Sequence, residues 1–382
     1  MPALKGKLYF NYGGQGPLPD GALRAMVDSW QTLQSLGPFG SDAFPWMARE
    51  TAALRSTLAR WCGVSPDRLA LTENVTGGCV LPLWGVPFQA GERLLLSDAE
   101  HPGVVAAALE LARRHDLTID RFPVQKARSA ADVLQSLEEG LQPRTRLVAL
   151  SHLLWNTGMP MPIEAVADRL EAHPLHPWLL VDAAQAMGSL ALGSGPDRAD
   201  IYAFTGHKWC CGPEGLGGVV LSQRLLATAS PTLIGWRSLA DEGQGGSPWH
   251  ADARRFEVAT SCLPLGAGLR ASLAALEGCG SDVERETVIR QRSQRLWQGL
   301  RDRAEVEPLL QEFPPASGLV SFTVPGHDPQ RLVMALAQRG LHLRMLADPP
   351  CLRACTHVVT TDEEIDTLLE HLDALLGPGR TS

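Results

Sequence analysis

A single lysine, Lys208, lies within the stretch AFTGHKWCCGPEG, residues 203–215. The apolar run Ile201–Phe204 before it is typical of a buried strand, and the glycines after it let the backbone approach a ligand closely. Because a buried ammonium group is costly unless it is paired, two interpretations are open. Lys208 either reaches water along its apolar stem, or it is kept neutral and can act as a nucleophile.

Polar clusters also follow four other predicted strands. Thr72–Gly78 opens a helix after one strand, and the other clusters are Asp98–His101, Ser151–Asn156 and Asp182–Gln185. In an open α/β sheet, ligands bind beyond the carboxyl ends of the strands. We therefore expect all four clusters to lie around Lys208, at one edge of the sheet.

The strands themselves are predicted from short apolar runs that alternate with helical stretches between about residues 65 and 222. The runs are Leu69–Thr72, Arg93–Ser97, Leu147–Ser151, Trp178–Val181, Ile201–Phe204 and Gly218–Leu221. Helices are expected at Val104–Arg114 and Ile163–Ala172. This alternation predicts an α/β fold with a mostly parallel sheet that is covered by helices on both faces.

The C-terminal third has a different, α+β pattern. The expected elements are a helix at Leu265–Leu276, a connecting helix over 281–303, a strand at Gly318–Val324, a helix at Pro329–Arg339, a strand at Leu341–Met345, and a last helix opened by the capping box Thr361–Glu364. We expect two domains. Residues 15–262 form a large cofactor-binding domain, and residues 1–14 with 263–382 form a smaller one that includes the connecting helix.

The groups gathered around Lys208 are those that a pyridoxal 5′-phosphate site requires. The aldehyde of that cofactor forms a Schiff base with a lysine, and an apposed carboxylate such as Asp182 keeps its pyridine nitrogen protonated. Its phosphate binds free N–H groups at a helix start and hydroxyl donors. The candidates for the phosphate are Thr76, Gly77, Thr205 and His207. Each role has a structural alternative: Asp182 is also a suitable helix cap, and the phosphate candidates also suit turns.

The chain resembles the class-V aminotransferases, also called the cysteine desulfurase-like group. The shared motifs are Tyr9–Gly16, Glu100-His101, Val181–Gln185 and Thr205–Gly215, and the resemblance extends as far as Cys351–Cys355. Within the group, the stretches FNYGGQGPLP, SHLLWNTG, AFTGHKW, GWRS, RFEVATS and GLVSFTV are similar to the cyanobacterial C–S lyases acting on L-cysteine and L-cystine. The resemblance implies a pyridoxal phosphate enzyme of fold type I, the aspartate aminotransferase-like fold.

The resemblance also implies roles for individual residues. Lys208, Asp182 and His101 would be catalytic, with the His101 ring stacked on the cofactor and Gln185 donating to its ring oxygen. Thr260 would reach the phosphate of the neighbouring subunit, which implies a homodimer. Arg353 would bind the α-carboxylate of the substrate through two parallel bonds. Gly14, Gln15 and Asn156 would complete the substrate pocket together with Arg344, for which a packing role is the alternative.

The resemblance leaves several reactions open. Desulfurases carry a catalytic cysteine on a mobile loop between arginines that correspond to Arg344 and Arg353, but here only the eight residues Met345–Leu352 lie between them. This favours β-elimination, which yields pyruvate, ammonia and a sulfide or cysteine persulfide that could supply iron–sulfur cluster assembly. The alternatives are a desulfurase that uses another cysteine, an epimerase or transaminase of the same group, and a non-catalytic homologue.

Composition and charge limit the binding partners and the cellular compartment that we expect. The chain has 382 residues and a net charge of −8, from 34 Lys and Arg against 42 Asp and Glu, without long basic tracts. This argues against binding to nucleic acid or an anionic membrane surface, and no apolar run is long enough for a signal peptide or a membrane span. Eight cysteines without an export signal suggest reduced thiols in the cytoplasm. Cys351, Cys355 and His357 match no common zinc spacing, so no metal site is expected.

Overall fold

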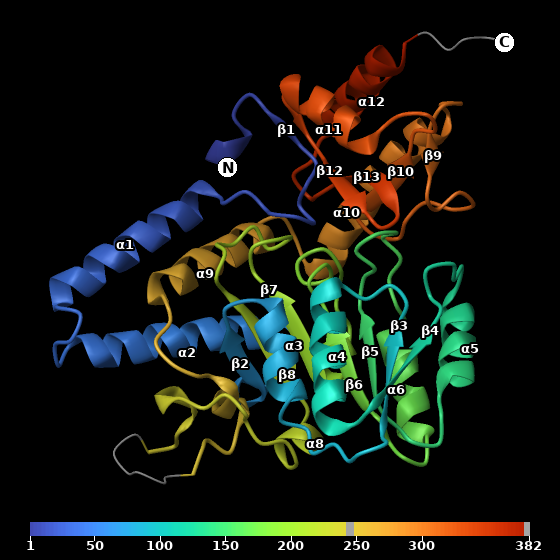
Figure 1. The fold of residues 1–382 in the computed structure, drawn as a ribbon. Helices are drawn as coiled ribbons and strands as arrows, with labels where there is room; N and C mark the ends of the chain where they lie inside the picture. Colours follow the sequence, from blue (N-terminus) through green and yellow to red (C-terminus); the bar gives the residue numbers. More distant parts are fainter. Residues whose placement is uncertain (242–247, 378–382) are drawn as a thin grey trace.

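The structure, a computed structural model, describes residues 1–241 and 248–377. Its largest element is a seven-stranded sheet of order β2-β8-β7-β6-β5-β3-β4 (Figure 1). The strands are β2 (Leu69–Thr72), β3 (Arg93–Ser97), β4 (Thr118–Phe122), β5 (Thr145–Ser151), β6 (Trp178–Asp182), β7 (Ile201–Thr205) and β8 (Gly217–Leu221). Only β8 runs antiparallel to its neighbours β2 and β7. The prediction of an α/β fold with a mostly parallel sheet is therefore confirmed.

Helices cover both faces of this sheet, as the sequence predicted. One face packs against α2 (Ala43–Trp61), α5 (Ala130–Gly140), α6 (Ile163–Ala172) and α9 (Leu263–Glu277). The other face packs against α3 (Val75–Leu83) and α4 (Pro102–His115). Neighbouring residues of one strand join opposite cores, as Val181 and Leu180 do. Strands buried on both faces read as continuous apolar runs, which is why the sequence located them well.

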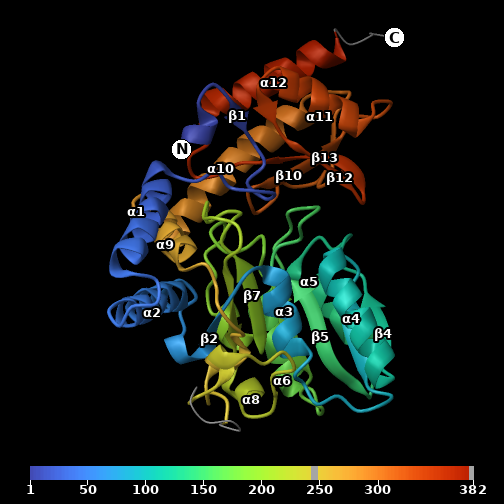
Figure 2. The same cartoon turned by 60° about the vertical axis from the view of Figure 1, so that its left-hand side comes forward.

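A smaller part lies above the carboxyl edge of the large sheet in both views (Figures 1 and 2). Its four strands, in the order β12-β13-β10-β9, are β12 (Arg344–Ala347), β13 (Pro350–Cys355), β10 (Leu319–Thr323) and β9 (Glu307–Pro308). The helices α10 (Asp282–Arg301), α11 (Pro329–Gln338) and α12 (Asp362–Leu376) pack with them around a separate core. The capping box at the start of α12 is confirmed: Thr361 Oγ1 accepts from Glu364 N, and the Glu364 carboxylate accepts from Thr361 N.

One predicted strand, Leu341–Met345, is wrong as a single element. It divides into β11 (Leu341–His342), which pairs with β1 (Leu8–Tyr9), and β12, which belongs to the four-stranded sheet. The apolar pattern runs through both strands because each buries alternate side chains, so the sequence does not mark the change of partner.

The remaining α-helices of the described part are α1 (Asp20–Leu36), α7 (Gly195–Arg198) and α8 (Gln223–Leu226). Helix α9 packs along α1 and also contacts α2. The predicted domain boundary after residue 262 stays a prediction, and residues 242–247 and 378–382 of the two predicted ranges lie outside the described part. Within the described part, no helix combines the length and apolar character that a membrane span needs.

Candidate active site

Lys208 lies in the loop that follows β7, where its carbonyl accepts a hydrogen bond from Cys211 N (2.9 Å). Its side chain lines a pocket together with His101, Asp182 and Gln185. Burial lowers the pKa of Lys208 to about 8, and Arg353 and Arg344 act in the same direction, whereas the charge of Asp182 acts against it. Since part of the amine is then neutral near physiological pH, Lys208 is suited to nucleophilic and proton-transfer roles.

Asp182 is the last residue of β6 and is only 5% exposed. Its Oδ1 accepts from Ala184 N (2.9 Å), and the carboxylate lies close enough to raise the pKa of Lys208 against the effect of burial. A buried carboxylate is costly unless cations or donors neutralise it. Asp182 therefore provides a pocket in which a cationic ring nitrogen would be stabilised.

His101 caps the start of α4, and its Nδ1 accepts from Gly103 N (3.1 Å). The neutral ring therefore carries its proton on Nε2. Burial is the main cause that lowers the pKa of His101, and the charge of Lys208 adds to the effect. The ring faces the pocket and meets Trp155 edge-on, with 6.0 Å between ring centroids and 73° between planes.

Trp155 is a pocket residue that the sequence reasoning missed. Its indole donates to Ala99 O (3.2 Å), and its carbonyl accepts from Arg353 Nη1 (2.8 Å). It thus links the loop that carries His101 with Arg353, which comes from the smaller sheet. Its place in the stretch SHLLWNTG, directly before the predicted Asn156, is the one signal in the sequence that pointed to it.

Two of the four phosphate candidates lie where two helix starts come close together. Thr76 and Gly77 lie in the first turn of α3, and a Cβ added at Gly103, in the first turn of α4, would lie 3.5 Å from Thr76 Oγ1. Helix starts attract anions through their free N–H groups and dipoles. The Gly77 amide already donates to Asn74 Oδ1 (2.8 Å), so an anion here would compete with that cap. Thr205 and His207 pair with each other, with 2.7 Å between Oγ1 and Nδ1.

Arg353 extends from β13 and is 2% exposed. Burial lowers the pKa of its guanidinium, and its buried Nε has no hydrogen-bond partner among the described residues. Such an orphaned donor suits an anionic ligand. Arg344 is exposed on the neighbouring strand.

Of the other predicted substrate residues, Gly14 and Gln15 lie in a turn near the N-terminus, and Asn156 is buried. A Cβ on Gly14 would lie 2.6 Å from Asn11 Oδ1, and the Gln15 carbonyl accepts from Tyr9 Oη (2.6 Å). Asn156 is buried, with Oδ1 accepting from Thr157 N (2.9 Å). Gly13 lies close to both Gln185 and Arg353, because a Cβ there would be 3.0 Å from Gln185 Oε1 and 3.1 Å from Arg353 Nη2.

The predicted residues thus fall into two groups. The structure brings His101, Asp182, Gln185 and Lys208 together around one pocket, which is also lined by Val75, Ser151, Leu153, Trp155 and Ala184. The other predicted residues are not part of that lining: Thr76, Gly77, Thr205, His207, Gly14, Gln15, Asn156, Arg344, Arg353 and Thr260.

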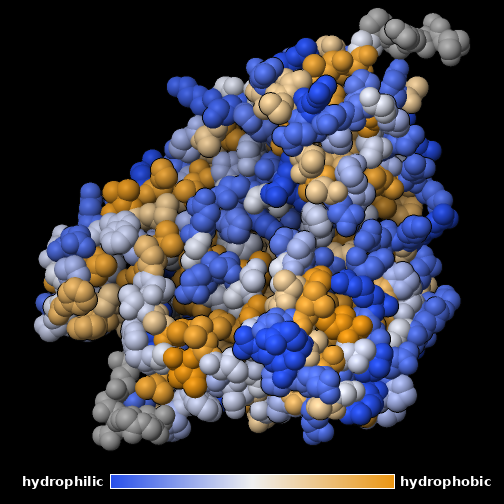
Figure 3. Space-filling view, viewed as in Figure 1, coloured by the Kyte–Doolittle hydropathy of each residue, from blue (hydrophilic) through white to orange (hydrophobic). Residues whose placement is uncertain are grey.

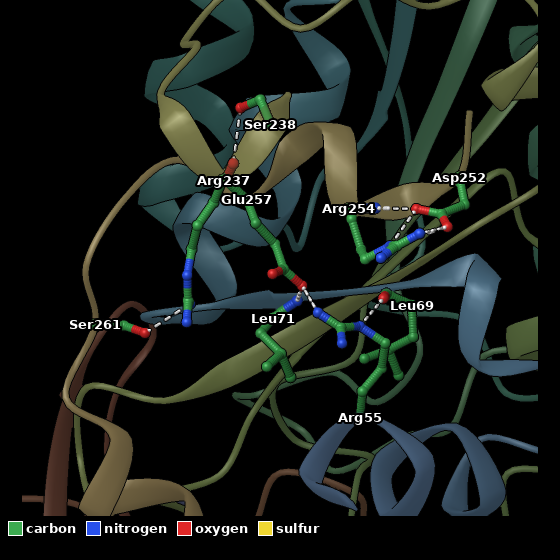
Figure 4. A network of polar contacts seen from close by, with 9 residues as sticks. All are labelled: Arg55, Leu69, Leu71, Arg237, Ser238, Asp252, Arg254, Glu257 and Ser261. Carbon is green, nitrogen blue, oxygen red and sulfur yellow. Dashed lines mark hydrogen bonds and ion pairs between the residues drawn. The ribbon is translucent and has the colours of Figure 1, made fainter. Parts of the chain in front are cut away.

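Thr260 is exposed. The segment before it is held by the network of polar contacts around Glu257 that Figure 4 shows. The anchor is Glu257, whose Oε1 accepts from Arg55 Nη2 (2.5 Å) and from Leu71 N (2.9 Å), while its carbonyl accepts from Ser238 Oγ (2.7 Å). Both partners of this ion pair are buried. The network fixes the backbone three residues before Thr260, so this exposed threonine is held in a defined position on the surface.

Comparison with known proteins shows which family this chain is similar to. The sequence pattern described as aminotransferase class-V matches residues 9–368. Isopenicillin N epimerase of Streptomyces clavuligerus is 31% identical, over 96% of this chain and 94% of that protein. A probable cysteine desulfurase of Methanothermobacter thermautotrophicus is 24% identical, over 99% and 97%.

Solved structures give the same result. A complex of the cystine C–S lyase C-DES with its reaction product cysteine persulfide is similar with a TM-score of 0.93 and 42% identity, covering 97% of this chain and 98% of that one. A variant of C-DES with glycine covalently linked to its PLP cofactor has a TM-score of 0.92 and 41% identity, covering 97% of both chains. The cysteine desulfurase CsdA from Escherichia coli, at 21% identity and a TM-score of 0.85 over 98% and 96% of the two chains, shares the fold.

Proposed function

The chain belongs to the class-V aminotransferase family, and on that basis we propose that it is a pyridoxal phosphate-dependent C–S lyase. Its substrates are L-cystine and L-cysteine, and its reaction is β-elimination. The observation that carries the proposal is the pocket itself, in which Lys208, with its pKa lowered to about 8, lies beside a buried carboxylate and an imidazole. The similarity to the cystine lyase supports the choice of substrate.

The residues present fit pyridoxal 5′-phosphate. Lys208 would hold its aldehyde carbon, Asp182 its ring nitrogen and His101 its ring face. Its phosphate would bind at the two helix starts, with Thr76, Gly77, Thr205 and His207 as the candidate donors. When bound, the cofactor supplies an electron sink for the pair that is released at the substrate Cα.

The side chains of this protein then have separate tasks. Arg353, buried and with a free Nε–H, binds the α-carboxylate of the amino acid. Once the substrate amine has taken its place at the aldehyde carbon, the free amine of Lys208 would take the proton from Cα. The Cβ–S bond breaks and its electron pair leaves with sulfur, as cysteine persulfide from cystine or sulfide from cysteine. Hydrolysis of the remaining enamine by water gives pyruvate and ammonia, so atoms and electrons balance without an oxidant.

We further propose a homodimer in which Thr260 reaches the phosphate site of the partner. Thr260 is exposed and anchored, as this role requires. Three apolar side chains of α1, namely Leu23, Val27 and Trp30, are exposed at helical spacing, and Phe39 is 90% exposed beyond the end of α1. Figure 3 shows apolar surface along the side of the molecule where α1 and α2 lie. A second copy of the chain would cover this surface.

Two further parts of the proposal concern the acceptor of the sulfur and the cellular compartment. The released persulfide would pass its sulfur to an acceptor in iron–sulfur cluster assembly, and the protein would work in the cytoplasm. Both rest on the resemblance to the family and on the cysteine content.

The second candidate is an epimerase, which the likeness to isopenicillin N epimerase over nearly the whole chain favours. An epimerase returns a proton to Cα and keeps the Cβ–S bond, whereas a desulfurase yields alanine. Product analysis separates the three. The purified protein, loaded with pyridoxal phosphate and given L-cystine, should release pyruvate and ammonia in equal amounts. Alanine as the main product, or D-cystine without pyruvate, would overturn the lyase assignment.

A further inference from the structure

The residue directly after Lys208, Trp209, is held on several sides. Its indole is completely buried and packs nearly parallel to the rings of His357 and Tyr12, at 6.1 Å and 6.4 Å between centroids. The two latter rings stack on each other at 4.3 Å. The Trp209 carbonyl also lies 3.0 Å from Nε2 of His357. Trp209 is thus held both through its ring and through its backbone carbonyl.

The polar edge of this indole is directed at Gln185. Trp209 Nε1 donates to Gln185 Oε1 (2.8 Å), and Gln185 Nε2 donates to Gly13 O (2.9 Å). An indole nitrogen is only a donor, so it must meet the oxygen of the amide. The amide nitrogen is thereby turned toward Gly13, and it has two N–H groups, of which the bond to Gly13 O uses one.

Gln185 is also one of the residues that line the pocket of Lys208 and Asp182. Because the oxygen of the amide is turned toward Trp209, the group that Gln185 can offer to the pocket is its remaining N–H. We propose that Trp209 is a positioning residue that fixes the Gln185 amide as a hydrogen-bond donor toward the ring oxygen of the cofactor. This inference rests on the proposed function, because it needs that cofactor in the pocket.

The effect of Trp209 depends on the difference in free energy between a Gln185 amide that is hydrogen-bonded to the indole and one that is not. If position 209 had no N–H group, Gln185 Oε1 would lose this partner inside the protein, and a buried carbonyl without a donor is costly. The amide would then turn to find another donor. An amide oxygen turned toward an electron-rich ring oxygen repels it, so the donor to the cofactor would be lost for part of the time.

The test is Trp209→Phe in the cofactor-loaded protein, followed by a pH titration of the absorbance of the bound cofactor. A hydrogen bond donated to the ring oxygen makes that oxygen bind its shared proton less tightly. Loss of the donor therefore raises the pH at the midpoint of the titration. One hydrogen bond corresponds to a rise of about half a pH unit or more. The matched control is Trp178→Phe, because the buried Nε1 of Trp178 has no hydrogen-bond partner among the described residues. Its midpoint should equal that of the wild type.

A double-variant cycle separates positioning from packing. In a Gln185→Leu background, Trp209→Phe should cause no further change of the midpoint, since its effect passes through Gln185. A Trp209→Phe variant that unfolds earlier but keeps the wild-type midpoint would overturn the inference. So would an equal shift in both backgrounds.

Should Trp209→Phe not fold, a measurement on the wild-type indole takes its place. In protein labelled with 15N-tryptophan, Gln185→Leu should move the Trp209 indole N–H signal upfield and increase its exchange with solvent, while the Trp178 signal stays. An unchanged Trp209 signal would overturn the inference. Failure of the cofactor assignment is recognised separately, because the wild type would then show no absorbance from bound cofactor. Failure of the lyase assignment alone is recognised from the products formed from L-cystine.

Discussion

Arg344 and Arg353 lie directly opposite each other in the antiparallel pair of β12 and β13. The hairpin between them closes with Ala347 opposite Pro350, so only Asp348 and Pro349 form the turn. Cys351 lies on β13 opposite Leu346 and is completely buried. A hairpin of this length cannot carry a cysteine to a substrate sulfur in the way that a mobile loop does.

The cysteines of this hairpin should therefore be dispensable for the reaction. Burial raises the pKa of Cys351 to about 11 and also raises the pKa of Cys355, so neither is a reactive thiolate. We expect Cys351→Ala and Cys355→Ala to keep pyruvate production from cystine within about tenfold of the wild type, with a loss of stability of ~1–3 kcal/mol. Pyruvate and alanine are measured together. Loss of turnover in either variant, or alanine as the main wild-type product, would restore the desulfurase interpretation.

Arg353→Lys should raise KM for cystine by about tenfold or more, because an ammonium cannot form the two parallel bonds of a guanidinium. The turnover number should change less, since the variant leaves untouched the lysine amine that we propose removes the proton. Arg344→Lys is the control, because Arg344 is exposed and its guanidinium is not enclosed. Steady-state kinetics decide the point: equal effects of the two variants would move the carboxylate site away from Arg353.

The rate at which the cofactor-free protein captures pyridoxal phosphate should rise with pH around a midpoint near the Lys208 pKa of about 8, and level off at higher pH where the amine is neutral. The charge of Asp182 raises this pKa, so Asp182→Asn should shift the midpoint to lower pH. Borohydride reduction followed by peptide mapping should find the cofactor on Lys208, and on no peptide of Lys208→Ala. Cofactor fixed at another lysine would disprove the assignment.

Glu257→Leu should destabilise the protein by about 3–5 kcal/mol, because it leaves the buried Arg55 guanidinium without its counter-ion. Urea unfolding of the cofactor-free protein measures this. Glu110→Ala, which removes an exposed carboxylate from Arg113 and Arg114, is the control and should change the midpoint little. If the two variants unfolded alike, the anchor before Thr260 would be no stronger than a surface ion pair.

How well the sequence predicted the fold depended on burial. All six expected strands of the large sheet are present. Five are central strands, whose burial on both faces gives apolar runs, and the edge strand β2 is itself mostly buried. Strand β4 was missed since it is an edge strand with the polar sequence Thr-Ile-Asp-Arg-Phe, whose exposed and half-buried residues have no apolar pattern. The split of Leu341–Met345 was missed because pairing partners are decided by segments far away in the chain.

The site shows the same difference between features with a local sequence pattern and features that depend on distant segments. The sequence predicted His101, Asp182, Gln185 and Lys208 because each follows a strand and belongs to a motif. The bond from Arg353 to the Trp155 carbonyl spans 198 positions of sequence, and the bond from Trp209 to Gln185 depends on the direction of one amide. Contacts of this kind follow from packing and leave no local pattern.

The pairing of β1 with β11 has a consequence for the order of events during synthesis. Leu8 pairs with Leu341, and Gly13 N donates to Cys355 Sγ, a contact that spans 342 positions. At roughly 5–20 residues per second, a ribosome that has made Leu8 needs on the order of 20–70 s more to reach its partner. All seven strands of the large sheet have been made well before that moment, whereas Gly13 and the guanidinium of Arg353 meet only near the end of translation. A nascent chain can therefore complete the strand that leads to Lys208 long before Gly13 and Arg353, which we propose take part in binding the amino acid, come together.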